Sequence, residues 1–264
     1  MTIENTHKDE NCSYVCKFRR IDKRLLKLLS DRAIYIPTVA GVNDPLEGIL
    51  TEGLSFGSTF VPTEEELSDY ATQATEDMKT YLQTVGVYCV SEHNKKWHSS
   101  NFLPMWASYA DDHHGVCIVF QRKPLTDARF KWVNVEYITH PHNYRASHPQ
   151  TLQPPQFNPD LFGTAQAKLA KKYDYWQYER ELRLVAQPEC TGYQPMDKFF
   201  DLHALVFGFK VEPEDILRVL NQLPDDLKQT LLNSSDRGIF QVIKPHSLHM
   251  PKSLKDLRPF LECA

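Results

Sequence analysis

Hydrophobic residues along this chain occur in short runs whose spacing is strand-like in some places and helix-like in others. Residues 14–18 alternate apolar and polar positions, as a half-buried β-strand does. A helix follows, whose apolar face is predicted to consist of Leu25, Leu26, Leu28 and Leu29. Further strand-like runs lie at 33–36, 85–90, 132–137, 182–186 and 203–209, and helical patterns lie at 162–173, 212–220 and 224–232. Because the two kinds alternate irregularly, the pattern predicts an α+β fold with a central mixed or antiparallel sheet and flanking short helices.

Residues 105–120 are the segment around which the other patterns can be arranged. Trp106 and Tyr109 have helical spacing, and residues 116–120 have the apolar, β-branched composition of a buried strand. Two aspartates and two histidines separate these parts. Because glycine has no Cβ, Gly115 is expected to end the helix in a left-handed conformation. We therefore predict a helix, a polar hinge and a strand, with Trp106, Tyr109 and His113 as candidates for lining a pocket.

Composition and charge narrow the class of protein. The 264 residues, of which 41% are hydrophobic, suffice for one large domain. Residues 12–264 are predicted to form it, and the polar residues 1–11 to form a disordered tail. The net charge of -4 provides no general attraction to nucleic acid or to an anionic membrane. No apolar run approaches the roughly 20 residues of a membrane helix, and no signal peptide is recognisable. A cytoplasmic protein without membrane contact is expected.

Two glutamates and an arginine form the most suggestive group of charges. Glu179 and Glu181 are two positions apart in an expected strand, so both should point to one face, with Arg183 beside them. Their mutual repulsion should raise one carboxyl pKa unless Arg183 or a lysine compensates. Such a pair suits a general base or a ribose-binding acid. The alternative is a row of ion pairs on a half-exposed strand. Trp176, in an aromatic cluster, could wall a pocket for a flat ring.

Basic residues at the end of the first strand are candidates for binding phosphate. Lys17 and Arg19 lie there, and a guanidinium can form two parallel hydrogen bonds to a phosphate. Arg19 is favoured over Lys17 for this geometry. The alternatives are simple solvation at the surface or a salt bridge to Glu181.

A turn over residues 43–48 contains a second set of polar candidates. Asn43, Asp44 and Glu47 share it with a proline, so a carboxylate there could orient a ligand hydroxyl or a metal ion. More often, such a turn is fixed by side-chain hydrogen bonds to its own backbone. The acids and histidines of the hinge are adjacent in sequence, and adjacent residues seldom bind the same ion. No metal is therefore predicted.

Several well-known catalytic motifs are missing from the sequence. It has no Walker loop, no Gly-x-Gly-x-x-Gly, no Gly-x-Ser-x-Gly and no His-Glu-x-x-His. Kinase, Rossmann dehydrogenase, serine hydrolase and zincin mechanisms therefore lack their usual parts. Cys117 is a poor candidate nucleophile, because its apolar neighbours should raise its pKa and suppress the thiolate.

Five motifs, in order, resemble the bacterial family catalogued as domain of unknown function 2971. The resemblance spans roughly residues 14–220, and naming this family implies no settled activity. The motifs are Lys17-Phe18-Arg19, Asn43 to Gly48, Met105-Trp106 with Tyr109-Ala110-Asp111 and His-Gly, Trp176 with Tyr178-Glu179, Glu181 and Arg183, and Val206-Phe207-Gly208.

A weaker resemblance links the chain to the ADP-ribosyltransferase fold, and most closely to bacterial toxins that modify DNA. It consists of an opening strand with a basic residue, a leucine-rich helix and a late strand with Glu-x-Arg. The resemblance implies that Lys17 or Arg19 binds NAD, and that Glu181 orients its ribose and activates the acceptor. Those toxins have histidine where this chain has Lys17 or Arg19.

The resemblance makes an ADP-ribosyltransferase-like enzyme the first functional hypothesis. Glu181 and Glu179 would be catalytic, and Lys17, Arg19, Tyr109, Trp176 and Arg183 would hold the dinucleotide. The acceptor would be a nucleic acid or a protein, as for a toxin or defence protein. The alternatives are a non-catalytic module that senses a nucleotide or another ligand in bacterial defence, and a metal-dependent nuclease using Asp44, Glu47 and the hinge.

Overall fold

The computed structural model describes residues 14–41, 77–92, 103–138, 160–233, 238–241 and 252–253. The chain divides into two compact units. Unit 1 comprises residues 1–33, 90–124 and 195–264, and unit 2 comprises residues 34–89 and 125–194. Each unit combines helices with strands, so the predicted α+β class is confirmed. The predicted tail at residues 1–11 lies outside the described part of the chain.

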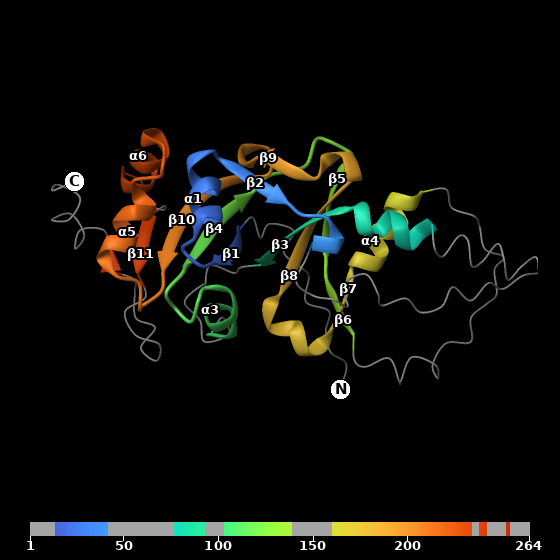
Figure 1. The fold of residues 1–264 in the computed structure, drawn as a ribbon, viewed down its shortest axis with the longest axis horizontal. Helices are drawn as coiled ribbons and strands as arrows, with labels where there is room; N and C mark the ends of the chain where they lie inside the picture. The colour runs from blue at the N-terminus through green and yellow to red at the C-terminus, as the bar shows by residue number, and fades with distance from the viewer. Residues whose placement is uncertain are drawn as a thin grey trace, which may run out of the picture. The chain divides into compact units, whose positions relative to one another are not determined.

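Unit 1 is built on a mixed sheet. Its strand order is β12-β11-β10-β4-β1-β3, in which β3 contributes residues 90–92. Strand β4 is antiparallel to both of its neighbours, whereas β10 is parallel to β11 (Figure 1). The bounds are Tyr14–Arg19 for β1, Gly86–Glu92 for β3, Val116–Arg122 for β4, Phe200–Phe207 for β10, Gly238–Gln241 for β11 and Lys252–Ser253 for β12. The prediction of a mixed sheet is confirmed.

The helices of unit 1 follow from local sequence signals. Helix α1 begins after Asp22, whose carboxylate accepts hydrogen bonds from the backbone N–H groups of Arg24 and Leu25. Of the four leucines predicted for its apolar face, Leu25, Leu28 and Leu29 are buried, whereas Leu26 is only partly buried. Helix α5 has proline at its first position, where no backbone N–H is needed. The bounds are Lys23–Ser30 for α1, Leu103–Tyr109 for α3, Pro213–Leu220 for α5, Asp225–Asn233 for α6 and Met196–Lys198 for the 3-10 turn η6.

Unit 2 contains three small groups of strands. Strand β8 lies between β3 and β5, β2 pairs with β9, and β6 pairs with β7. The strand bounds are Ala33–Ile36 for β2, Phe130–Asn134 for β5, Glu136–Ile138 for β6, Lys171–Tyr173 for β7, Glu181–Ala186 for β8 and Gly192–Pro195 for β9. The helical segments are 77–84, α4 at Leu161–Leu169, and the 3-10 turns η1 at Val39–Gly41, η4 at Asp174–Glu179 and η5 at Pro188–Cys190.

Two sequence-based predictions in unit 2 are wrong in detail. The single strand expected over 132–137 is two strands, because the backbone N–H of Val135 bonds to the carbonyl of Glu181 and the chain then joins a different sheet. The helix expected over 162–173 ends at Leu169. Residues 171–173 pair in parallel with β6 instead, and this pairing changes which way Lys172 points.

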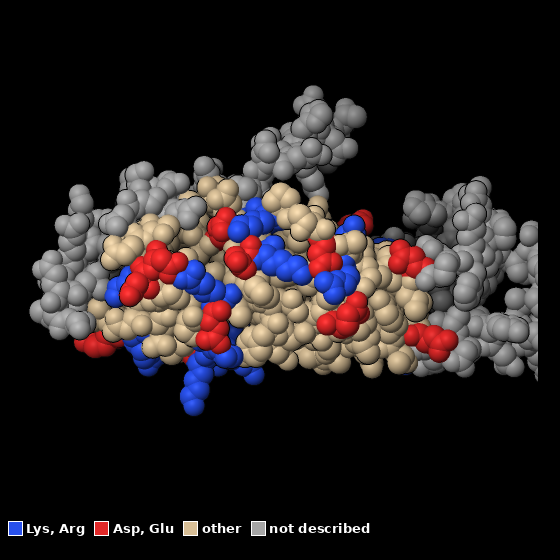
Figure 2. Space-filling view, turned by 90° about the horizontal axis from the view of Figure 1, so that it is seen from above, with Lys and Arg blue, Asp and Glu red and all other residues tan. Residues whose placement is uncertain are grey.

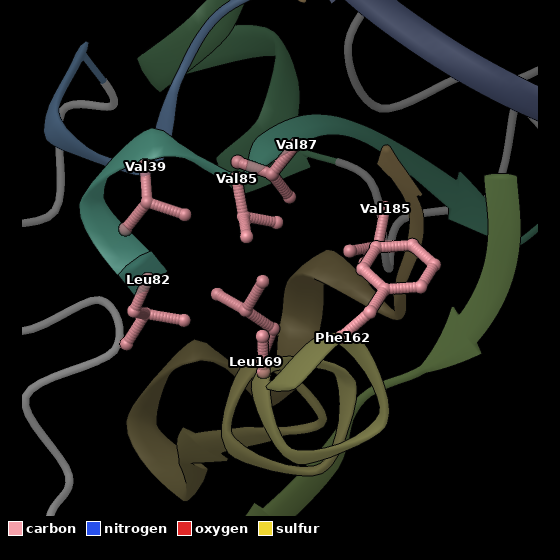
Figure 3. Close-up of a cluster of buried hydrophobic side chains, with 8 residues drawn as sticks. Val39, Leu82, Val85, Val87, Phe162, Leu169 and Val185 are labelled. Atoms are coloured by element: carbon pink, nitrogen blue, oxygen red, sulfur yellow. The ribbon is translucent and has the colours of Figure 1, made fainter. Parts of the chain in front are cut away.

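A compact apolar cluster fills the interior of unit 2. Its side chains come from η1, the helix over 77–84, the residue between this helix and β3, and β3, α4 and β8, and they point toward one another (Figure 3). The members are Val39, Leu82, Val85, Val87, Phe162, Ala165, Leu169 and Val185. Strand β8 is buried along its whole length, so side chains on both of its faces leave water. Any charged residue on β8 must therefore find partners inside the protein.

Surface charge is mixed in sign. Acidic and basic side chains are interspersed over the face shown in Figure 2, as the small net charge of -4 suggests. Within the described ranges, no helix is long and apolar enough to cross a membrane. None of Cys16, Cys89, Cys117 and Cys190 forms a disulfide. Burial, followed by a hydrogen bond to Cys16, raises the pKa of the Cys117 thiol, as the sequence predicted.

Candidate functional site

Four charged side chains meet in the interior of unit 2. Lys172, Glu179, Glu181 and Arg183 are 7%, 4%, 6% and 1% exposed. We refer to these four residues as the ion network. Charged residues are almost never this deeply buried unless they are paired. Three of the four were singled out from the sequence, and Lys172 was not.

Direct hydrogen bonds join the four residues into one network. Lys172 Nζ donates to Glu179 Oε2 at 2.6 Å and to Glu181 Oε2 at 2.8 Å. Arg183 Nε donates to Glu181 Oε1 at 2.8 Å, and Arg183 Nη2 donates to Glu181 Oε2 at 3.2 Å. Glu181 therefore receives a two-point contact from the guanidinium and a third contact from the lysine.

The local backbone explains why two glutamates reach one lysine. Glu181 and Arg183 point to the same face of β8 because side chains alternate along a strand. Glu179, however, is the last residue of η4 and does not lie on the strand, so that part of the prediction is wrong. Between them, Arg180 has a left-handed conformation with φ of 46°. This bend sets the direction in which Glu179 enters the network.

Groups outside the four residues complete the hydrogen bonding. Arg183 Nη1 donates to the carbonyl oxygen of Leu169, whose side chain belongs to the apolar cluster. The Tyr137 hydroxyl accepts a hydrogen bond from the backbone N–H of Glu181 at 2.7 Å. The Cys89 thiol donates to the Glu181 carboxylate. The sequence pattern identified neither Tyr137 nor Cys89, because their partners lie far away along the chain.

The ion network combines two acidic with two basic side chains, and this balance determines the protonation states of Glu181 and Lys172. Burial raises the pKa of Glu181, but Arg183 and then Lys172 outweigh burial and lower the pKa from 4.5 to about 2. Burial lowers the pKa of Lys172, but Glu181 and Glu179 outweigh it and hold this pKa above its usual value. The sequence requires that Arg183 or a lysine offset the repulsion between the two glutamates, and both Arg183 and Lys172 do so. Glu181 is therefore a carboxylate, and Lys172 is a cation, at neutral pH.

A row of aromatic rings leads along the chain to the network. Ring centroids are 5.5 Å apart for Tyr173 and Tyr175, 5.6 Å for Tyr175 and Trp176, and 6.0 Å for Trp176 and Tyr178. We call these four residues the aromatic row. Lys172 Nζ lies 5.1 Å from the centroid of the Trp176 ring, so the row and the network touch. Tyr175 is 54% exposed and presents its ring to solvent.

The polar hinge lies in unit 1 and differs from the prediction. Trp106 is buried, and its ring stacks on His113 with a centroid distance of 5.7 Å. The left-handed residues that follow α3 are Asp111, Asp112 and His113, and Gly115 is not among them. Aspartate tolerates this conformation better than most residues do. Tyr109, the last residue of α3, is partly exposed.

Gly115 is needed for a different reason from the one predicted. A Cβ atom there would lie 2.3 Å from the backbone oxygen of Arg19 on β1. Gly208 is similarly confined, since its Cβ would lie 2.0 Å from the backbone oxygen of His113. The two glycines also share a hydrogen bond, from Gly208 N–H to the carbonyl of Gly115. Close backbone packing, rather than a positive φ, therefore explains Gly115.

The other residues predicted for the site lie either in unit 1 or outside the described ranges. Lys17 and Arg19 lie on β1 in unit 1, at positions paired with Ile118 and Val116 of β4, and both are half-buried. Their predicted role in phosphate binding stays a prediction. The turn residues Asn43, Asp44 and Glu47 lie outside the described ranges.

In the described part of the chain, no group of three or more His, Cys, Asp or Glu side chains could hold a metal ion. In the hinge, Asp112 forms an ion pair with Lys210, and the His114 ring bonds to the carbonyl of Asp111. Both of these side chains therefore already have partners within the protein.

Comparison with known proteins gives one match. Residues 105–184 match the family described as protein of unknown function (DUF2971). The resemblance to this family is confirmed over that range, which begins in α3 and ends one residue after Arg183. The hinge, the aromatic row and the ion network all lie within it. No curated protein and no solved structure matches the chain.

Proposed function

We propose that this protein binds a nicotinamide dinucleotide at the aromatic row and transfers its ADP-ribosyl group. The observation that carries the proposal is the contact between the row and the network: Lys172 lies over the Trp176 ring and also bonds to Glu181. A flat ring can stack on exposed tyrosine, and an ionised carboxylate beside it can stabilise positive charge. These are the two needs of a reaction that expels nicotinamide from a ribose.

Glu181 serves in this proposal as an electrostatic group. With a pKa of about 2 it is a poor base at neutral pH. It can, however, stabilise the oxocarbenium-like ribose that forms when the bond between the ribose and nicotinamide breaks and its electron pair stays on nicotinamide. The acceptor then attacks the ribose carbon and loses its proton to solvent. The ribose must replace Lys172 beside Glu181, because that lysine occupies the carboxylate in the free protein.

A second candidate function is a non-catalytic module that senses a nucleotide. It is favoured by the saturation of the network, in which both Glu181 oxygens accept bonds from cations and the residue is 6% exposed. A network of this kind can simply hold η4 and β8 together beneath a binding surface. The module would recognise the same ring without turnover, as a defence protein does when it detects a ligand.

Dinucleotide binding tests what the two functions share. Isothermal titration calorimetry with NAD is expected to show binding to the wild type and about 5- to 150-fold weaker binding to Tyr175→Ala, since stacking on one ring contributes about 1–3 kcal/mol. Tyr193→Ala is the matched control, because Tyr193 is equally exposed but lies on β9. Unchanged binding in Tyr175→Ala, or no binding to the wild type, would remove the aromatic row from the proposal.

A transfer assay separates the enzyme from the sensor. The wild type is incubated in a bacterial lysate, and separately with bacterial nucleic acid, together with NAD labelled in its adenylate part. Transfer of label that is lost in Glu181→Gln, with NAD binding retained, supports the enzyme. Binding without transfer by the wild type supports the sensor.

A further inference from the structure

Three consecutive residues of the hinge have left-handed backbone conformations. The φ angles are 51° at Asp111, 48° at Asp112 and 71° at His113, and none of the three is glycine. Such a conformation costs conformational free energy at each position. The turn must therefore be held by contacts that outweigh this cost, and it should relax if they are lost.

His113 supplies most of these contacts. Its ring is 8% exposed and lies against two aromatic rings, with centroids 5.7 Å away in Trp106 and 4.5 Å away in Phe209. Its carbonyl oxygen accepts a hydrogen bond from the backbone N–H of Lys210 at 3.2 Å. Its own backbone N–H bonds to the carbonyl of Trp106 at 3.4 Å. His113 thus connects the end of α3 to the segment after β10.

One atom of this buried ring is unsatisfied. Nδ1 of His113 has no hydrogen-bond partner among the residues that the structure describes. A neutral imidazole tolerates this better than an imidazolium, in which both ring nitrogens carry protons and the ring carries a charge. The surroundings of His113 therefore favour the neutral ring over the protonated ring.

We infer that the hinge is a proton-operated switch, in which neutral His113 locks the left-handed turn and protonated His113 leaves the two rings and releases it. The inference does not depend on the proposed function, since it concerns unit 1 and requires no ligand. Release would free the turn at residues 111–113 to adopt ordinary backbone conformations.

Two of the three charged or titratable groups around His113 disfavour its protonation, and the third, Asp112, favours it. Asp112 and His114 flank it in its own turn, Lys210 comes from the segment after β10, and α3 carries no charged residue. Burial lowers the pKa of His113 from 6.5, Asp112 opposes this, and Lys210 and His114 reinforce it. The charge of Asp112 is already paired with Lys210, so it is a weak counter-ion for His113.

The switch is tested by following the ring and the turn in one pH titration. Carbon-detected NMR follows the imidazole of His113, and proton NMR follows the indole N–H of Trp106, from about pH 8 to about pH 5. We expect a His113 midpoint below 6.5, with the Trp106 signal shifting at the same midpoint. Amide exchange at Asp112 and His113 should accelerate below it, because their bonds to α3 open.

Two variants separate the switch from ordinary titration. His113→Asn cannot titrate and accepts a left-handed conformation, so its amide exchange should lack the acid step. His114→Asn should keep that step. A His113 midpoint at or above 6.5 would overturn the inference, as would protonation of His113 without faster exchange in the wild type. Persistence of the step in His113→Asn would also overturn it.

Discussion

Lys172 Nζ lies 2.8 Å from Oε2 of Glu181, although Lys172 belongs to the two-stranded sheet of β6 and β7 and Glu181 lies on β8, in a different sheet. Both side chains are more than nine-tenths buried. The contact makes each charge depend on the other, because neither side chain can reach bulk water to replace its partner. A substitution of either residue should therefore also destabilise the buried charge of the other.

Removing one charge from the ion network should destabilise the protein strongly. Glu181→Gln leaves Lys172 and Arg183 buried with only Glu179 as a carboxylate partner. We expect a loss of roughly 3–5 kcal/mol in the free energy of unfolding, as for other broken buried pairs. Urea denaturation followed by circular dichroism measures it.

An exposed ion pair provides the matched control for this change. Lys123 and Asp201 are 2.9 Å apart but partly exposed, so Lys123→Ala should cost at most about 1 kcal/mol. A Lys172→Met and Glu181→Gln double variant should lose less than the sum of the single changes. Additive losses would show that the two side chains do not act together.

Acid should weaken the protein through Glu181. Its pKa is about 2 in the folded chain and 4.5 in the reference state, so the carboxylate favours folding at and above pH 4.5. That contribution should be lost as the pH falls from about 4.5 toward about 2. Thermal unfolding of the wild type and of Glu181→Gln across this range measures it, and the difference between the two should shrink with acid. A constant difference would contradict the depressed pKa.

Alkali should weaken the protein partly through Tyr137. Burial is the main cause that raises the pKa of Tyr137, from 10.0 to about 12. Because the folded chain holds this proton more tightly, the stabilisation is complete below pH 10 and is lost as the pH rises toward 12. Tyr137→Phe should remove that part of the alkaline loss. It should also cost about 1 kcal/mol at neutral pH, since the Glu181 N–H loses its acceptor. Tyr193→Phe, at an exposed site, should change neither quantity.

Gly115 should not tolerate a methyl group. Gly115→Ala would place Cβ 2.3 Å from a backbone oxygen, and backbone cannot rotate away as a side chain can. We expect a loss of about 1–3 kcal/mol or more. In Gly41→Ala the nearest atoms are 3.7 Å away and belong to side chains, so that variant should be neutral or slightly stabilised. Equal stability of the two variants in urea denaturation would contradict the backbone contact.

The sequence predicted features that depend on local periodicity. The buried leucines of α1 and the shared face of Glu181 and Arg183 follow from spacing alone. Lys172 was missed because its neighbours read as the end of a helix, whereas pairing with β6 makes them a strand. The sequence around Lys172 is compatible with either the end of a helix or a strand, and the tertiary pairing with β6 decides in favour of the strand.

The hinge shows a second kind of limit. The sequence pattern places glycine at a helix end, and glycine there usually has a positive φ. Here Asp111, Asp112 and His113 adopt positive φ instead, and Gly115 is pressed against β1. That contact joins residues from distant parts of the chain, so no local sequence pattern could predict it.

The division of the chain into units has a consequence for synthesis on the ribosome. Unit 2 is complete once residue 194 has emerged, but unit 1 also needs residues 195–264. Strand β4 must wait for β10, its partner on one side, although its other partner β1 is made first. The nascent chain should therefore bury the ion network early and expose one side of β4 until β10 has been made. That interval is when binding by a chaperone would protect the chain most.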